Sequence, residues 1–220
     1  MHKLKNGILI AIEGIDGSGK SSLAKNLFQQ FLIQNYPVML TKEPGGTPLG
    51  LQLRTIVQEK KVAVCAKAEF MLFATDRAQH FYELIIPALS ENKIIISDRM
   101  ADSSLVYQGY GRGLDMEAIN TVNNFVMNGI KPNITVYVKV SNHVAAERIM
   151  KRNIALTSFE KEKEDFVAKL AYGFDQLYKN REDVIIVDGN QTQEQVLQET
   201  LAKLVSSLRL KGFGGQALNE

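Results

Sequence analysis

A glycine-rich segment near the N-terminus has the residue types and the spacing to bind the phosphates of a nucleotide. Residues 14–21 read GIDGSGKS and fit the pattern G-x-x-x-x-G-K-[ST]. Such glycines let successive backbone N–H groups converge at the start of a helix, where an anion is stabilised. Lys20 is expected to reach the β- and γ-phosphates, and the Ser21 hydroxyl to ligate Mg²⁺. The predicted contacts of this nucleoside triphosphate site are Gly14, Gly17, Ser18, Gly19, Lys20, Ser21 and Ser22.

A second acidic group is expected close to the same metal. Asp98 directly follows an apolar run at residues 94–97. In an open parallel sheet, ligands bind beyond the carboxyl ends of the strands, which is where this side chain would lie. Asp98 either joins Ser21 at the metal or caps the segment that follows it, and both interpretations stay open here.

The elements that must position these residues can be read from periodicity. Short apolar, β-branched runs predict buried strands at residues 8–12, 37–40, 94–97, 134–140 and 184–187. Longer segments with helical spacing predict helices at residues 21–34, 67–89, 115–127, 143–152, 161–179 and 193–210. Their alternation predicts an α/β protein with the three-layer P-loop NTPase fold, a five-stranded, mainly parallel sheet flanked by helices.

Composition narrows the class of protein. The chain has 220 residues, 45% of them hydrophobic, which suits a single domain over residues 1–210 and a frayed tail at 211–220. A net charge of +2 argues against a nucleic-acid partner, and no run approaches the roughly 18 apolar residues of a membrane span. Cys65, the single cysteine, excludes an internal disulfide and suits a reducing compartment. A cytoplasmic protein is therefore expected.

Three further motifs identify a class of phosphate-loop protein. No Asn-Lys-x-Asp motif follows a strand, so a GTPase switch is disfavoured. Instead the chain carries TKEPGGT at residues 41–47, FATDR at 73–77 and DRMADSSLVYQ at 98–108. In this order and spacing, the motifs resemble those of the thymidylate kinases across nearly the whole chain. The resemblance implies transfer of the ATP γ-phosphate to dTMP, giving dTDP and ADP with Mg²⁺, by a homodimer.

The resemblance also implies roles around the acceptor phosphate and the sugar. Arg54 and Arg99 are expected to grip the acceptor phosphate, because a guanidinium can bind two oxygens at once. Asp16 and Glu43 are expected near the sugar 3′-OH and the metal, and Tyr107 beside the ribose 2′ position. The residues expected to be catalytic are Asp16, Lys20, Arg99 and Arg152.

The thymine ring is expected to lie against one helix. Phe73 and Arg77 are four residues apart and share a helix face. By resemblance, Phe73 stacks on the ring, Arg77 hydrogen-bonds its O4, and Ser103 and Gln108 contact its edge. Each of these residues could instead pack in the core or lie on the surface. Whether the peptide bond before Pro44 is cis or trans also stays open. The expected dTMP contacts are Asp16, Glu43, Pro44, Arg54, Phe73, Arg77, Arg99, Ser103, Tyr107 and Gln108.

Thymidylate kinases keep the arginine that stabilises the transferring phosphoryl group either in the phosphate loop or in a lid. Gly17 occupies the loop position, so the lid, residues 148–160, must supply that charge. The Asp-Arg-x-Glu element typical of such lids reads TSFE at 157–160, and its arginine is missing. We favour Arg152 as the lid cation, with Lys161 or Lys163 as the alternative, and expect adenine between Arg148 and residues 188–191. The charged run 160–165 is expected to face solvent.

Two other functions remain open at this level. The chain could phosphorylate another nucleoside monophosphate, such as dUMP or dCMP, within the same fold. The altered lid is also compatible with a nucleotide-binding switch that has no useful kinase activity.

Overall fold

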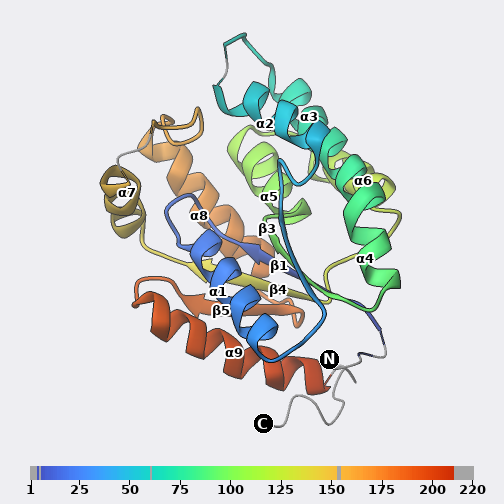
Figure 1. Ribbon diagram of the computed structural model, residues 1–220. Helices are drawn as coiled ribbons and strands as arrows, with labels where there is room; N and C mark the ends of the chain where they lie inside the picture. The colour runs from blue at the N-terminus through green and yellow to red at the C-terminus, as the bar shows by residue number, and fades with distance from the viewer. Residues whose placement is uncertain (1–3, 5, 60, 153–154, 211–220) are drawn as a thin grey trace.

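Five parallel strands, followed in each case by a loop at the same edge of the sheet, organise the molecule. The computed structural model describes residues 4, 6–59, 61–152 and 155–210, so the predicted tail at 211–220 lies outside the described residues. The strands are β1 (Ile8–Glu13), β2 (Val38–Lys42), β3 (Ile94–Asp98), β4 (Ile134–Lys139) and β5 (Val184–Asp188). They pair in the order β2-β3-β1-β4-β5, and all of these pairings are parallel (Figure 1). The predicted α/β fold is confirmed.

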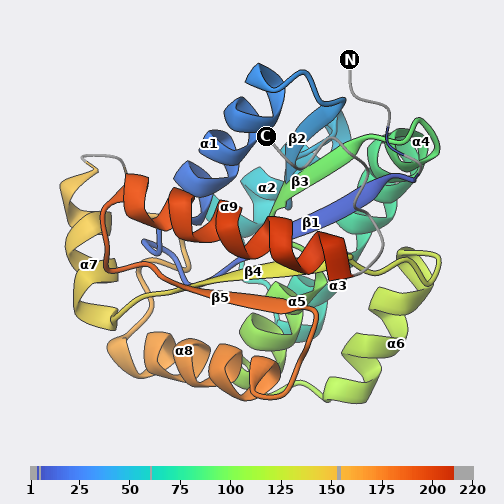
Figure 2. The ribbon, with the colours of Figure 1, turned by 90° about the horizontal axis from the view of Figure 1, so that it is seen from below.

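The apolar strands are buried on both faces of the sheet. Along β1, Ile8, Ile10 and Ile12 pack into one core with α1 (Lys20–Ile33) and α9 (Gln193–Leu210). The alternate residues Leu9 and Ala11 pack into a second core with helical residues that follow α3. Figure 2 shows α9 and α8 (Glu164–Tyr178) on opposite sides of β4 and β5. Two covered faces explain why the strands read as continuous apolar runs.

Several helices agree with their sequence signals to within a few residues. The helix α6 (Met116–Val126) begins where the Asp115 side chain accepts the Ala118 N–H at 2.7 Å. The helix α7 (Asn142–Lys151) is capped by Ser141 in the same way, at 3.4 Å from the Val144 N–H. In the described part of the chain, no helix is both long and apolar enough to cross a membrane.

The helix predicted at 67–89 is not one continuous α-helix. It consists of α3 (Ala66–His80), a π-helical segment η1 (Phe81–Ile85) and α4 (Ile86–Ser90). Pro87 lies just after the π segment. A proline has no backbone N–H and its ring crowds the preceding turn, so a regular α-helical ladder cannot run through it. The wider turn of η1 accommodates that break.

Two helical regions were not predicted. The helix α2 (Pro48–Glu59) starts with proline at its first position, and the Thr47 hydroxyl accepts the Gly50 N–H at 3.0 Å. A threonine followed by proline was the available signal. Residues 98–112, where no helix was predicted, are largely helical, as α5 (Ala101–Ser104) and the π-helical η2 (Leu105–Gly111). Both regions lie beside the carboxyl edge of the sheet.

Candidate functional site

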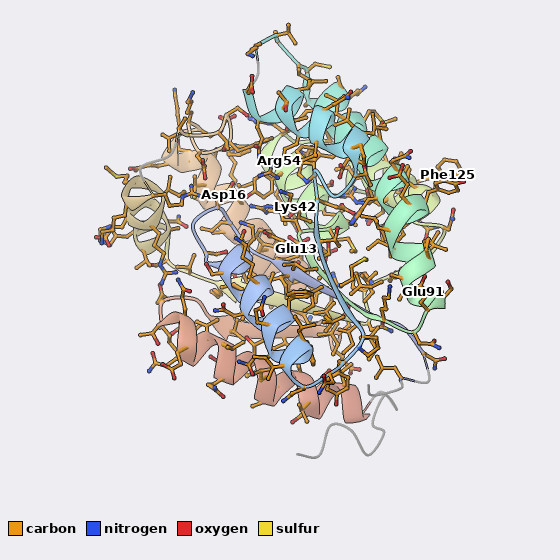
Figure 3. All side chains as sticks on the ribbon, viewed as in Figure 1. Glu13, Asp16, Lys42, Arg54, Glu91 and Phe125 are labelled. Carbon is orange, nitrogen blue, oxygen red and sulfur yellow. The ribbon has the colours of Figure 1, made fainter. Side chains whose placement is uncertain are left out.

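A cavity of about 950 Å³ lies at the carboxyl edge of the sheet. Every residue predicted for the site lines it except Gly14. Figure 3 shows Asp16, Lys42 and Arg54 toward the middle of the molecule, from the loop after β1, the end of β2 and α2. The lining residues that sequence reasoning did not single out include Lys25, Lys42, Val57, Gln58, Met100, Ser104, Val138, Ala155, Thr157, Thr192, Gln193 and Val196.

The phosphate loop holds its lysine in a buried position. Gly17 and Gly19 have φ of 80° and 96°, left-handed conformations that favour glycine. Lys20 Nζ donates to the Ile15 carbonyl at 3.2 Å and lies 3.4 Å from Asp16 Oδ1. Burial and the neighbouring Arg99 lower the pKa of Lys20. Ser18 Oγ is buried without a hydrogen-bond partner among the described residues, which leaves it available to a ligand.

Gly14 supports the loop from behind instead of lining the cavity. Its carbonyl accepts a hydrogen bond from Arg99 at 3.0 Å. Its φ is 150°, and a Cβ at this position would come within 2.8 Å of the Val138 carbonyl oxygen. The glycine therefore lets the end of β1 pass close to β4 and carry the loop into the site.

Arg99, Asp16 and Tyr107 form one hydrogen-bonded cluster, in which Tyr107 is buried and the other two are half-buried. Arg99 donates to Asp16 Oδ1 at 2.6 Å and to the Tyr107 hydroxyl at 2.9 Å, and Tyr107 donates to Asp16 Oδ2 at 3.1 Å. Burial alone would raise the pKa of Asp16, but the charges of Arg99 and Lys20 hold it well below its usual range. Burial raises the pKa of Tyr107 far above the usual value for a phenol. Asp16 is thus an anion that aligns a neutral phenol and a cation.

The backbone of Arg99 is itself unusual. Its φ is 74°, a left-handed conformation that a residue with a side chain rarely adopts. Its N–H donates to the Ile12 carbonyl at 2.9 Å, which ties the turn after β3 to β1. Strained backbone of this kind costs on the order of 1 kcal/mol and persists where surrounding contacts hold it. Here those contacts aim the guanidinium into the cavity.

Ser21 and Asp98 place two oxygen atoms side by side at the floor of the cavity. The Ser21 hydroxyl donates to Asp98 Oδ2 at 2.5 Å. The other oxygen, Asp98 Oδ1, is buried and has no partner among the described residues. A buried carboxylate oxygen without a donor is costly unless a cation or water meets it. Hydroxyl and carboxylate oxygens are also the ligands that Mg²⁺ prefers, so the residues present fit this ion.

Glu13 is a buried acid that sequence reasoning missed. It ends β1, is fully buried, and accepts the Met100 N–H at 2.7 Å. Its other oxygen accepts the Ser103 hydroxyl at 2.6 Å. Burial raises the pKa of Glu13 to about 7, with Asp102 also raising it and Arg99 opposing. The only available signal was an acidic residue at the end of an apolar strand, just before the phosphate loop.

Arg77 lies in the wall of the cavity with its donors already engaged. Nε donates to Glu43 Oε2 at 2.8 Å, and one terminal nitrogen donates to Asn123 Oδ1 at 2.7 Å. The other terminal nitrogen donates to the Met100 carbonyl at 3.2 Å, and both nitrogens reach Ser104 Oγ at 3.3 Å. Arg77 is 1% exposed. The bonds to Ser104 are the longest of this set.

Glu43 connects Arg77 to a buried histidine. His80 Nδ1 lies 2.9 Å from Glu43 Oε1, and His80 Nε2 shares a hydrogen bond of 2.6 Å with Thr41 Oγ1. Burial would raise the pKa of Glu43, but the charge of Arg77 and the His80 hydrogen bond lower it. The following peptide bond, Glu43–Pro44, is cis, which answers the question that the sequence left open. This network fixes the loop after β2.

Arg54 and Phe73 complete the predicted acceptor side. Arg54 donates to the Pro44 carbonyl at 2.9 Å, and burial lowers its pKa. The Phe73 ring faces the Phe159 ring of the lid, with centroids 6.0 Å apart. Phe159 also lies edge-on to Tyr107 at 5.7 Å. The lid therefore covers the part of the cavity between Phe73 and Tyr107.

The two lid arginines have different partners. Arg148 donates to the carbonyls of Ser18 at 3.3 Å, Gly189 at 2.7 Å and Gln191 at 3.4 Å. It thereby joins the phosphate loop to the loop after β5, where adenine was expected. Arg152 forms an ion pair with Glu160 at the other end of the lid.

The prediction that the run 160–165 faces solvent is wrong for Glu160. Its side chain is 5% exposed, since one oxygen meets Arg152 and the other accepts the Thr157 N–H at 2.9 Å. Ser158 occupies the position of the missing arginine. Its N–H donates to the Gln58 carbonyl and its hydroxyl to the Val57 carbonyl, both at 2.9 Å. The lid is thus attached to the end of α2 where other lids carry a charge.

Comparisons with known proteins agree with this geometry. A sequence profile described as thymidylate kinase matches residues 12–200. The thymidylate kinase of Halothermothrix orenii is 37% identical over 206 residues, which cover 92% of this chain and 98% of that protein. The crystal structure of thymidylate kinase from Ehrlichia chaffeensis superposes with a TM-score of 0.73 at 30% identity. That match covers 90% of this chain and 98% of the other.

Proposed function

The chain belongs to the thymidylate kinase family, and from that premise we propose how its residues divide the phosphorylation of dTMP to dTDP. The family implies ATP as the phosphoryl donor. The single observation that carries the division of roles is that the predicted donor, acceptor and lid residues line one cavity. Phosphoryl transfer needs mainly positioning and charge stabilisation, and a shared cavity brings both substrates together.

The donor phosphates bind in the phosphate loop. Lys20 is held inside the loop and exchanges its bond to the Ile15 carbonyl for phosphate oxygens. Ser18 Oγ has no hydrogen-bond partner in the described part of the chain, and it would donate to the same phosphates. Adenine lies beside Arg148, between α7 and the backbone of Gly189 and Gln191. The hydrogen bonds from Arg148 to the carbonyls of Ser18, Gly189 and Gln191 keep the phosphate loop and the loop after β5 at a fixed separation.

Ser21 and Asp98 would hold Mg²⁺, which would offset the negative charge of the donor phosphates. Support comes from Asp98 Oδ1, which is buried and has no hydrogen-bond partner among the described residues, and from the Ser21 hydroxyl, which lies 2.5 Å from Oδ2. The Ser21 hydroxyl now donates its hydrogen to Asp98. That hydrogen would have to rotate away before the hydroxyl oxygen could bind a cation.

The acceptor phosphate lies between Arg54 and Arg99, and the base lies between Phe73 and the lid. The Phe73 and Phe159 rings now touch each other, with centroids 6.0 Å apart, so Phe159 would have to move outward for the base to stack on Phe73. The Gln108 amide reads its edge, and Arg77 offers O4 a donor by giving up a long bond to Ser104. Tyr107, bonded to Arg99 and Asp16, limits the room at the sugar.

Arg152 supplies the lid charge during transfer. It lines the cavity from the end of α7, and Glu160 holds it there. Asp16 aligns Arg99. Arg152 then approaches the transferring phosphoryl group, and Arg99 approaches the acceptor phosphate. Charge spread over the phosphoryl oxygens in the transition state is then met by placed guanidinium groups, not by bulk water.

The protein forms a homodimer through α3, η1 and α6. Met71, Tyr82 and Phe125 project from these neighbouring elements and are 52%, 76% and 79% exposed. Figure 3 shows Phe125 at the outer edge of the molecule, away from Asp16 and Arg54. Clusters of exposed large apolar side chains mark interfaces.

The free thiol of Cys65 suits the reducing cytoplasm.

A coupled ADP-release assay with dTMP and Mg·ATP tests these assignments as a set. The acceptor panel includes dUMP, dCMP and dGMP at the same ATP concentration. We expect ADP release with dTMP, weaker release with dUMP, and little with the other two. A preference for dCMP or dGMP would contradict the assignment of the base pocket, and tight ATP binding without ADP release would contradict a competent lid.

A further inference from the structure

Gln108 is held by a carboxylate that lies behind it. Its Nε2 donates to Glu69 Oε1 at 2.9 Å, from η2 to α3. Both residues are buried, with Glu69 2% and Gln108 1% exposed. Gln108 lines the cavity, whereas Glu69 does not. The other polar atom of this amide, Oε1, belongs to a side chain that lines the cavity.

The half-buried Arg112 forms an ion pair with Glu69. Arg112 donates to Glu69 through Nε at 3.3 Å and through a terminal nitrogen at 3.4 Å. The guanidinium itself is fixed, because it lies 4.4 Å from the Phe166 ring centroid and donates to Glu162 at 2.6 Å. A carboxylate beside such a cation accepts hydrogen bonds and donates none.

The orientation of the Gln108 amide follows from that chemistry. An amide has a donor end and an acceptor end, and only the donor end can face an ionised carboxylate. The reversed amide would bring its oxygen against Glu69 Oε1 at the present 2.9 Å separation. Two acceptors in contact in a buried place repel each other and leave both without a donor. Gln108 therefore has to turn its oxygen away from Glu69.

We propose that Glu69 is a specificity-determining positioning residue, which makes Gln108 present a hydrogen-bond acceptor to the base. The inference rests on the proposed function, in which Gln108 reads the pyrimidine edge. Thymine and uracil carry a donor at N3, which a fixed amide oxygen accepts. Cytosine carries an acceptor at N3, which the same oxygen repels. Glu69 thus selects for keto pyrimidines without touching the substrate.

The test compares dTMP with 5-methyl-dCMP, which has the same methyl group, sugar and phosphate and differs at N3 and at position 4. The variant Glu69→Gln keeps the size of the side chain but can both donate and accept, so it tolerates either orientation of Gln108. Glu162→Gln is the matched control, because it removes a carboxylate from the same Arg112 without contacting Gln108. The quantity measured is the ratio of kcat/KM for the two acceptors.

We expect Glu69→Gln to lower that ratio about tenfold, as loss of one oriented hydrogen bond would, and Glu162→Gln to change it less than about twofold. A general loosening of the pocket would lower both kcat/KM values and leave the ratio in place. An unchanged ratio in Glu69→Gln would overturn the proposal. An equal fall of the ratio in Glu162→Gln would also overturn it, since the charge of Arg112 would then be the cause.

A second measurement uses the unaltered protein and does not depend on the folding of a variant. The side-chain amide protons of Gln108 are followed by ¹H–¹⁵N NMR during titration with dTMP. A proton bonded to Glu69 keeps its shift and its slow exchange when dTMP binds, whereas a proton that turns to the base moves, and the second result would refute the inference. If the unaltered enzyme does not favour dTMP over 5-methyl-dCMP at all, the proposed base pocket itself fails.

Discussion

Arg152 and Glu160 form an ion pair between the two ends of the lid, and the carboxylate is the more buried member. The Glu160 side chain is 5% exposed and that of Arg152 is 47% exposed. Glu160 also accepts the Thr157 N–H at 2.9 Å, so the arginine is attached to a turn that is already fixed. The lid therefore holds Arg152 in place through another of its own residues, Glu160.

Replacing Arg152 by alanine is expected to reduce turnover much more than it weakens ATP binding. In the proposed mechanism the side chain meets charge that develops in the transition state, and removing one such arginine costs about 100-fold or more in kcat. Steady-state kinetics with dTMP, together with direct ATP binding by calorimetry, separate the two effects. Lys151→Ala, on the same helix end and paired with Glu147, is the control. Near-normal kcat in Arg152→Ala would mean that another residue supplies the lid charge.

Glu160→Gln is expected to lower kcat by an intermediate factor, because Arg152 remains but loses its ionic support. The double variant with Arg152→Ala should then be no slower than Arg152→Ala alone. Residues that act through one another show such non-additive effects in a double-mutant cycle. Strict additivity of the two logarithmic changes in kcat would mean that Glu160 does not act through Arg152.

Asp98→Asn is expected to raise the Mg²⁺ concentration needed for half-maximal activity by about tenfold or more. The amide keeps the shape of the side chain and its bond to Ser21, but it removes the charge that a divalent cation needs. Activity is titrated with Mg²⁺ at a fixed concentration of ATP. A variant that saturates at the same Mg²⁺ concentration as the unaltered protein would argue that Asp98 only caps the segment after β3.

Glu13 is expected to make stability fall as the pH rises from about 4.5 through about 7. Its pKa is higher in the folded protein than in the unfolded chain, so the folded state binds the proton more tightly. The resulting stabilisation is complete below the unfolded value and is lost as the pH passes the folded one. For a shift of this size the loss is at most about 3 kcal/mol.

The measurement is the free energy of unfolding in urea across this pH range, for the unaltered protein and for Glu13→Gln. The amide cannot ionise and preserves the acceptor for the Met100 N–H, so its curve should lack the decline assigned to Glu13. Glu91→Gln, an exposed change well away from Glu13 (Figure 3), should follow the unaltered protein. Parallel curves for Glu13→Gln and the unaltered protein would exclude Glu13 as the group responsible.

Phe125→Asp is expected to shift the protein from dimer to monomer, because it places a charge in the apolar face of α3, η1 and α6. Molecular mass is measured by light scattering after size-exclusion chromatography at several protein concentrations. Met150→Asp is the matched control, because Met150 is 81% exposed but lies on α7. A monomeric mass for the unaltered protein, or a dimer that survives Phe125→Asp, would contradict the proposed interface.

The sequence predicted those parts of the molecule that are encoded locally. The phosphate loop, the strands and the segments after them are contiguous in the chain, and parallel pairing brings their ends to one edge. Contacts between segments that are far apart in the sequence could not be predicted from it. Glu69 meets Gln108 across 39 positions, and Arg77 meets Asn123 across 46, so periodicity within one element carries no information about them. Glu160 was misjudged because its neighbours in sequence are charged, whereas its exposure is set by Arg152 and Thr157.

Gly17 shows why the two arrangements of the catalytic arginine are separated by more than one substitution. A Cβ at this position would lie 2.3 Å from the Ala145 carbonyl oxygen, and φ is 80°. The backbone of α7 thus occupies the space in which a side chain from the loop would begin. Moving the arginine from lid to loop would require α7 to withdraw and the loop to change conformation at the same time. If Arg152 is the catalytic cation, as proposed, its replacement could not be offset by an arginine at position 17 alone.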